Sequence, residues 1–158
     1  MGPRGREHLM KLIRPLILAL LASGLIAPPL YAQNVTGAWS FRADVKRKGC
    51  TLSGNMTISE PAANGTRTCS FVSTETCEAI PDLNIKMDQA CKITPQADSY
   101  IMRSTVVGTL TEGYNVGNYL ADHFIVKPTS PKEMKGIWQD TRYSAPVIFW
   151  RDDALPVS

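Results

Sequence analysis

Histidine is scarce in this chain. His123 is the only histidine beyond the N-terminal leader, and it follows Asp122 in the segment LADHFIV. Adjacent side chains of a strand point to opposite faces, so we expect these two residues not to form a catalytic dyad and His123 to lie at the surface. Glu75 and Glu78, which flank Cys77, are expected in a solvated turn. The cysteines lack the close C-x₂₋₄-C spacing of zinc sites. The sequence therefore predicts no catalytic residue, no metal, no cofactor and no enzymatic activity.

Long hydrophobic runs are absent beyond residue 32. The apolar run at 16–26 is shorter than the roughly 20 residues that a membrane-spanning helix needs. Basic residues precede it and Ala32 follows it, so residues 1–32 are predicted to be a signal peptide cleaved near Ala32, with Met10 as an alternative start. No cysteine lies at the cleavage point to carry a lipid. We expect a bacterial protein, periplasmic or secreted, with no membrane span.

Residues 33–158 also lack a net charge. The leader holds four of the 17 basic residues and one of the 14 acidic residues, which leaves 13 of each in the rest of the chain. The basic isoelectric point therefore reflects the leader and gives no reason to expect a nucleic-acid partner. No glycine-rich phosphate loop joins a strand to a helix, which argues against nucleotide chemistry.

Helical periodicity is missing as well. Apolar and polar residues instead alternate over short segments that are interrupted by Gly, Pro, Asn and Asp, as is typical of β-strands. We expect strands at residues 38–45, 50–60, 67–75, 90–94, 100–110, 123–127, 133–140 and 145–150, and one helical turn at 77–83. Residues 33–158 are therefore predicted to be a single all-β domain, an antiparallel up-and-down barrel of about eight strands that leaves no free edge.

The four cysteines all lie in this domain: Cys50, Cys69, Cys77 and Cys91. An even number in an exported chain predicts two disulfides. Asn64-Gly65 is a strong hairpin signal, and a turn centred between Ala63 and Asn64 places Cys50 opposite Cys77, at the separation that a disulfide needs. The second disulfide then joins Cys69 to Cys91. Pairing Cys50 with Cys69 and Cys77 with Cys91 remains the alternative.

Three features are candidates for binding. The loop 111–122 carries Tyr114 and Tyr119 on a glycine- and asparagine-rich backbone, which suits a contact surface. Half-buried tyrosines of an ordinary surface loop are the structural alternative. Trp138 and Tyr143 flank the connection between the last two strands, and core packing is the alternative for Trp138. The arm at 33–36 precedes the first strand, and such arms are usually inert.

Gly37-x-Trp39 on the first strand, together with Arg151 after the last strand, resembles the calycin barrels. This group includes the lipocalins, the avidins and the bacterial metalloprotease inhibitors. The resemblance implies that Trp39 closes one barrel end, that Arg151 stacks on its indole ring, and that Gly37 allows a close backbone approach.

The first half of the chain is most similar to the inhibitors. Like them it has a cysteine followed by a short proline-containing segment, here Cys77 and EAIPDL. In that family the arm before the first strand enters the protease active site, which implies the same role for residues 33–36. The second cysteine pair and the greater length depart from that family.

These expectations define a non-enzymatic, exported binding protein. Inward side chains tend to fill a small barrel, which favours recognition of an envelope protein, with inhibition of a protease or another envelope enzyme as its specific form. The alternative is a lipocalin-like carrier of a small apolar ligand, with the loop 111–122 as its lid. An enclosed apolar cavity would favour the carrier, and a packed interior with an aromatic patch would favour a protein partner. The oligomeric state is left open.

Overall fold

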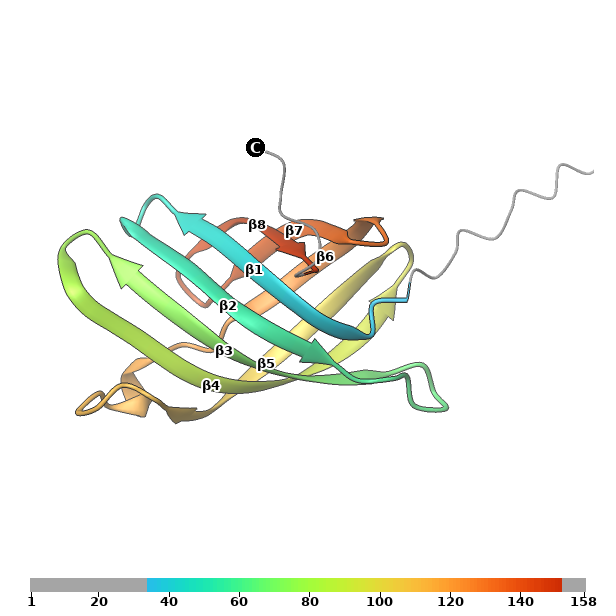
Figure 1. The fold of residues 1–158 in the computed structure, drawn as a ribbon, viewed down its shortest axis with the longest axis horizontal. Helices are drawn as coiled ribbons and strands as arrows, with labels where there is room; N and C mark the ends of the chain where they lie inside the picture. The colour runs from blue at the N-terminus through green and yellow to red at the C-terminus, as the bar shows by residue number, and fades with distance from the viewer. Residues whose placement is uncertain (1–33, 152–158) are drawn as a thin grey trace, which may run out of the picture. The chain divides into compact units, whose positions relative to one another are not determined.

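The computed structural model describes residues 34–151, so the predicted signal peptide and Gln33 lie outside the described residues. Eight antiparallel strands form a closed barrel in which each strand pairs with its neighbour in the chain and β8 pairs with β1 (Figure 1). The strands are β1 (Gly37–Val45), β2 (Cys50–Ile58), β3 (Arg67–Cys77), β4 (Ile80–Gln96), β5 (Ser99–Thr109), β6 (His123–Ser130), β7 (Glu133–Gln139) and β8 (Ser144–Trp150). The predicted all-β barrel is confirmed. No helix within residues 34–151 is long and apolar enough to cross a membrane.

The helical turn expected at 77–83 is wrong. Glu78 and Ala79 form a tight turn, and β4 then runs without interruption from Ile80 to Gln96. Pro81 accounts for part of the difference, because proline disfavours helical backbone at the residue before it, here Ile80. The strand expected at 90–94 is therefore the end of a much longer strand, and the only helical element of the described residues is the 3₁₀ turn η1 (Val116–Asn118).

The β2–β3 hairpin has the register that its turn predicts. Ile58 faces Cys69 and Cys50 faces Cys77, while β3 and β4 place Cys69 opposite Cys91. Disulfides join Cys50 to Cys77 and Cys69 to Cys91, as expected from the hairpin, and the alternative pairing is wrong. The sequence separations of 27 and 22 residues correspond to about 3–4 kcal/mol of stability for each bridge in the chain-entropy model.

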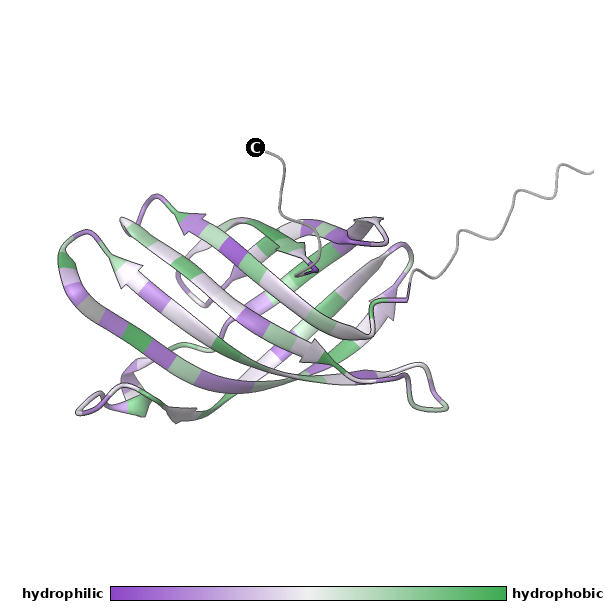
Figure 2. Cartoon of the chain, in the orientation of Figure 1, coloured by the Kyte–Doolittle hydropathy of each residue, from purple (hydrophilic) through white to green (hydrophobic). Residues whose placement is uncertain are grey.

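Aromatic side chains fill one half of the barrel interior. Trp39 and four phenylalanines are each at most 3% exposed, and neighbouring phenylalanine ring centroids are 5.2 to 5.8 Å apart. The phenylalanines are Phe41, Phe71, Phe124 and Phe149. Gly54 makes room for this cluster, because a Cβ there would overlap the ring of Phe41. Hydrophobic and hydrophilic residues alternate along the strands, as period-2 patterning requires (Figure 2).

One end of the barrel, which we call the Trp39 end, is sealed. The Arg151 guanidinium carbon lies 4.3 Å from the centroid of the Trp39 ring, and the indole N–H of Trp39 donates to the Val35 carbonyl at 2.8 Å. Gly37 has a φ of +111°, and a Cβ there would lie 3.0 Å from an Arg151 guanidinium nitrogen. The stacked geometry expected for Trp39, Arg151 and Gly37 is therefore present.

Candidate functional site

The four aromatic residues proposed from the sequence meet at the opposite end of the barrel, which we call the loop end. Tyr114 and Tyr119 come from the loop 111–122, Trp138 from β7, and Tyr143 from the β7–β8 turn. Together they line one cavity of about 130 Å³. Trp138 is 1% exposed and belongs to the hydrophobic core, so it packs in the interior and also forms part of the cavity wall.

Asp122 forms the floor of this cavity, and the sequence did not indicate it as a site residue. Its side chain is 1% exposed. The carboxylate accepts hydrogen bonds from the indole Nε1 of Trp138 at 2.8 Å, the hydroxyl of Tyr119 at 3.0 Å and the amide Nε2 of Gln89 at 2.5 Å. The backbone N–H of Asp122 donates to Gln89 Oε1 at 2.9 Å. Strands β4 and β7 and the loop are thus joined at one carboxylate.

Burial controls the electrostatics of this floor. Removal from water raises the pKa of Asp122, and hydrogen bonds from four neutral side chains offset only part of that rise: Trp138, Gln89, Ser73 and Tyr119. Burial, with the negative charge of Asp122 beside it, likewise raises the pKa of Tyr119 well above its usual range. Among residues 34–151, no lysine, arginine or histidine lies within ion-pair distance of Asp122. A buried acid without a cation is costly to ionise, which is the physical cause of the shift.

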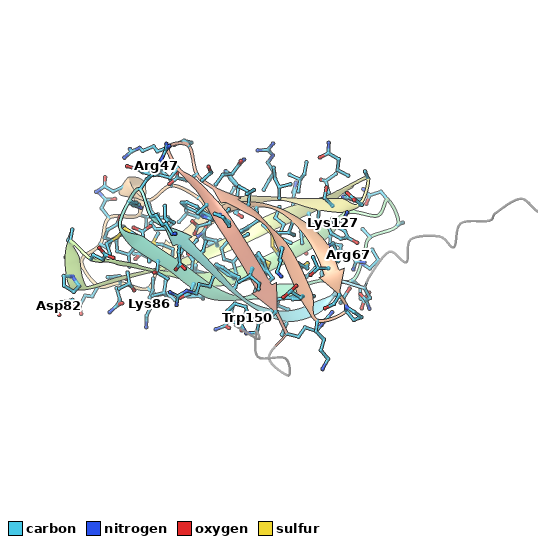
Figure 3. All side chains as sticks on the ribbon, turned by 90° about the horizontal axis from the view of Figure 1, so that it is seen from above. Arg47, Arg67, Asp82, Lys86, Lys127 and Trp150 are labelled. Atoms are coloured by element: carbon cyan, nitrogen blue, oxygen red, sulfur yellow. A yellow bond between two sulfur atoms is a disulfide. The ribbon has the colours of Figure 1, made fainter. Side chains whose placement is uncertain are left out.

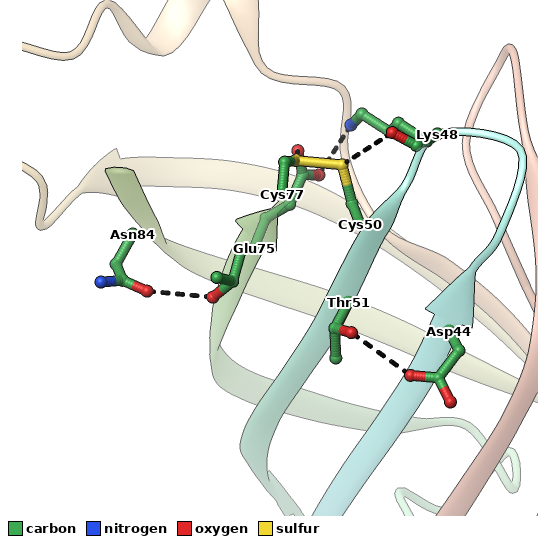
Figure 4. Close-up of a disulfide and its surroundings, with 8 residues drawn as sticks. Asp44, Lys48, Cys50, Thr51, Glu75, Cys77 and Asn84 are labelled. Carbon is green, nitrogen blue, oxygen red and sulfur yellow. Dashed lines mark hydrogen bonds and ion pairs between the residues drawn. A yellow bond between two sulfur atoms is a disulfide. The ribbon is translucent and has the colours of Figure 1, made fainter. Parts of the chain in front are cut away.

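Glu75 and Lys48 form the wall of the cavity near its mouth. Glu75 is 6% exposed, and its carboxylate lies 2.7 Å from Lys48 Nζ (Figure 4). The expectation that Glu75 lies in a solvated turn is wrong, because it points inward from β3, two residues before Cys77. Glu75 and the sulfurs of the Cys50–Cys77 disulfide are close enough to share a metal ion, but sulfur ligation requires free thiolates.

His123 lies outside this site. Asp122 points into the barrel, whereas the Nδ1 of His123 accepts a hydrogen bond from the backbone N–H of Ser104 at 3.0 Å. The expected separation of the two side chains is therefore present, but His123 is half-buried rather than a simple surface residue. Burial, with the nearby positive charge of Arg103, lowers the pKa of His123.

The arm before β1 is folded onto the Trp39 end. Val35 is 1% exposed, and Arg151 Nη2 donates to the carbonyls of Asn34 at 2.8 Å and Thr36 at 3.0 Å. An arm that enters a protease active site must be free to extend. Residues 34–36 are instead part of the barrel seal, so the role implied by resemblance to the inhibitors has no support in this segment.

Simple alternation along the strands could have indicated the polar interior. Ser73 and Glu75 continue the inward-facing series of Cys69 and Phe71 on β3, and Gln89 lies between the inward-facing residues of β4. Gln89 Nε2 also donates to Ser73 Oγ at 2.9 Å. Polar residues at buried positions of a small barrel predict an internal hydrogen-bond network, because unpaired polar groups are costly there.

Apolar side chains also gather on the outer wall. Ile125 and Ile137 face each other across β6 and β7 and are 39% and 43% exposed. Ile101 pairs with Ile125, and Pro146 pairs with Ile137, so the row crosses four strands. This row was not proposed from the sequence, and it lies away from the cavity.

Comparison with known proteins supports the fold alone. No family model matches the chain, and no curated protein matches its sequence. Among solved structures, the chain is similar to a de novo designed, fluorescence-activating β-barrel, with a TM-score of 0.52 and 13% sequence identity over 77% of this chain and 96% of the other. The chain is thus a small closed β-barrel, and its membership of the calycin group stays a prediction.

Proposed function

We propose that the protein is a non-enzymatic binding protein, exported to the periplasm or secreted, that recognises a protein partner through the loop end. The observation that carries the proposal is the meeting of Tyr114, Tyr119, Trp138 and Tyr143 at one end of a barrel whose opposite half is packed and sealed. Tyrosine and tryptophan are enriched at the centres of protein interfaces. The two disulfides fit an oxidising compartment.

The surface around the cavity extends this contact region. A shallow groove of about 530 Å³ borders the cavity and is lined by Arg47 and residues 139–144. Figure 3 places Arg47 at the loop end and Arg67 toward the opposite end. Arginine, like tyrosine, is a frequent contributor to binding energy at interfaces. Inhibition of a protease or another envelope enzyme is the specific form of this proposal, and it would use the loop end and not the arm.

The alternative, a carrier of a small apolar ligand, fits neither hollow at the loop end well, because the larger one is a shallow groove lined mostly by polar residues. Pockets for such ligands typically measure about 300–1,000 Å³ and are mostly apolar. The cavity here is about 130 Å³, and Asp122, Glu75 and Lys48 are part of its lining. An apolar ligand would remove these charged groups from water without providing hydrogen bonds in return.

Site-specific photo-crosslinking tests the proposal. A photoreactive residue at Tyr114 in the full chain should give a discrete adduct with one envelope protein in the bacterium that carries the gene. The adduct should disappear when untagged wild-type protein competes. The matched control places the same residue at Ala63, an exposed position of the β2–β3 turn at the opposite end.

Two results would refute the proposal. One is equal labelling from both positions. The other is no competed adduct from Tyr114 together with a bound apolar molecule in the native mass spectrum, which would establish the carrier instead.

A further inference from the structure

The cavity at the loop end contains two buried acids but pairs only one of them with a cation. Its two buried acids are Asp122 and Glu75. Lys48 Nζ lies 2.7 Å from the Glu75 carboxylate, whereas the hydrogen-bond partners of Asp122 are all neutral donors. At the rim, Asp140 accepts hydrogen bonds from two backbone N–H groups and Arg142 is exposed. A single additional cation would balance the interior.

We propose that the cavity receives one cationic side chain of the partner, a lysine or an arginine, and that Asp122 is its counter-charge. This inference rests on the proposed function, because it assigns the chemistry of the group that enters the loop end. The partner's contact residue would then be identified by its positive charge, and its apolar stem would lie against the aromatic wall.

Asp122 can accept a hydrogen bond from such a group. A carboxylate offers about four acceptor positions. Oδ1 accepts from the indole of Trp138, whereas Oδ2 accepts from the hydroxyl of Tyr119 and the amide of Gln89. The Ser73 hydroxyl also hydrogen-bonds the carboxylate. A cationic N–H donor from the cavity would displace this neutral donor, because a charged donor makes a shorter and stronger bond than a neutral one.

The aromatic wall also favours a cation. Tyr114, Tyr119, Trp138 and Tyr143 all contribute to the lining, and the faces of tyrosine and tryptophan rings attract ammonium and guanidinium groups. The existing cation of the site, Lys48, lies only 6.0 Å from the ring centroid of Tyr143. The volume of about 130 Å³ corresponds to roughly four water molecules at about 30 Å³ each, which suits the end of one side chain.

Small probes can test this chemistry in the wild-type protein. We would titrate the protein with n-butylamine and n-butylguanidinium, which stand for the lysine and arginine side chains, and with n-butanol as a neutral probe of similar size. The readout is the NMR signal of each tryptophan indole N–H. Both cations should shift the Trp138 signal saturably and leave the Trp39 signal unchanged, because Trp39 lies at the opposite end. The neutral probe should shift neither signal.

The matched variants are Asp122→Asn, which removes one acid from the cavity, and Asp98→Asn, which removes one acid from the opposite end of the barrel. Asp122→Asn should weaken binding of the cations at least tenfold, since tenfold corresponds to only about 1.4 kcal/mol, and Asp98→Asn should not change it. An unchanged Trp39 signal would show that the Asp122→Asn variant is folded. If that variant fails to fold, the comparison of cations with n-butanol in the wild type still decides.

The inference is overturned if neither cation shifts Trp138 up to its solubility limit, or if n-butanol shifts it equally. These outcomes are separable from failure of the proposed function. A competed adduct from Tyr114 without cation binding would refute the cationic side chain and keep the protein partner. Cation binding together with equal labelling from Tyr114 and Ala63 would support the cation site at Asp122 and refute the protein partner.

Discussion

Replacing Arg151 with alanine should weaken the barrel more than any other change of a single arginine, because this side chain joins three segments. Its guanidinium stacks on Trp39 at 4.3 Å. It donates from Nη2 to the carbonyls of Asn34 and Thr36 at 2.8 and 3.0 Å, and from Nε to the Pro131 carbonyl at 3.1 Å. The alanine variant loses all of these contacts at once.

The size of the effect follows from these four contacts. A cation–π contact of this kind contributes about 0.5–2 kcal/mol. The three hydrogen bonds contribute roughly 0.5–1 kcal/mol each, because their carbonyl acceptors lie near the surface and water can replace the donor. We therefore expect Arg151→Ala to lower the free energy of unfolding by roughly 2–5 kcal/mol. For a domain of this length the corresponding fall in melting temperature is roughly 8–19 °C.

Urea unfolding with both disulfides intact, followed by tryptophan fluorescence, measures this loss. Arg151→Lys keeps the charge but not the planar fork, so it should recover less than half of the lost stability. Arg47→Ala removes an exposed arginine of the β1–β2 turn and should change stability by less than about 0.5 kcal/mol. If Arg151→Ala stays within that same range, the stack on Trp39 does not stabilise the Trp39 end and the reasoning fails.

Three further predictions concern single positions. Gly136→Ala should lower the free energy of unfolding in urea by about 3 kcal/mol or more, because the added Cβ would overlap the Ile125 carbonyl. Gly108→Ala, which has open space around the new methyl group, should be nearly neutral, and similar losses in the two variants would contradict this reasoning. The imidazole signals of His123 should titrate below pH 6.5, since burial and the positive charge of Arg103 lower its pKa, and a midpoint at or above 6.5 would contradict this. Burial raises the pKa of Asp122 above 3.8, so the folded state holds a proton that the unfolded state releases. Wild-type stability should therefore fall as pH rises from about 4 through the folded pKa, and Asp122→Asn should remove that slope; parallel pH profiles of the two proteins would refute it.

Local patterns account for much of the barrel. Alternation along β2 and β3 assigns each side chain to a face, and the Asn64-Gly65 turn sets which residues are opposite. Those two constraints place Cys50 opposite Cys77 and leave Cys69 for Cys91, as the structure has them. The helical turn expected at 77–83 disregarded a local signal, because Ile80 precedes Pro81 and therefore prefers extended backbone.

The cavity could be predicted only in part. Tyr114, Tyr119, Trp138 and Tyr143 were proposed as separate features, and their meeting depends on barrel closure, which brings distant connections to one end. Asp122 was considered only as a partner of His123, and the expectation that the two side chains point to opposite faces agrees with the structure. Its actual partners include Gln89, 33 residues away in sequence, and no local pattern specifies such a contact.

The two ends of the barrel differ in what stabilises them. The Arg151 stack on Trp39 closes the Trp39 end, whereas the loop end has a polar interior and one long connection, residues 110–122, which apolar burial cannot hold to the same degree. The Cys50–Cys77 disulfide lies at that end, directly beside Glu75 and the turn that carries Lys48 (Figure 4). A covalent link there holds the cavity wall without filling the cavity. In the proposed function, the binding residues can point inward at this polar site because the disulfide and the shared apolar core stabilise the barrel around it.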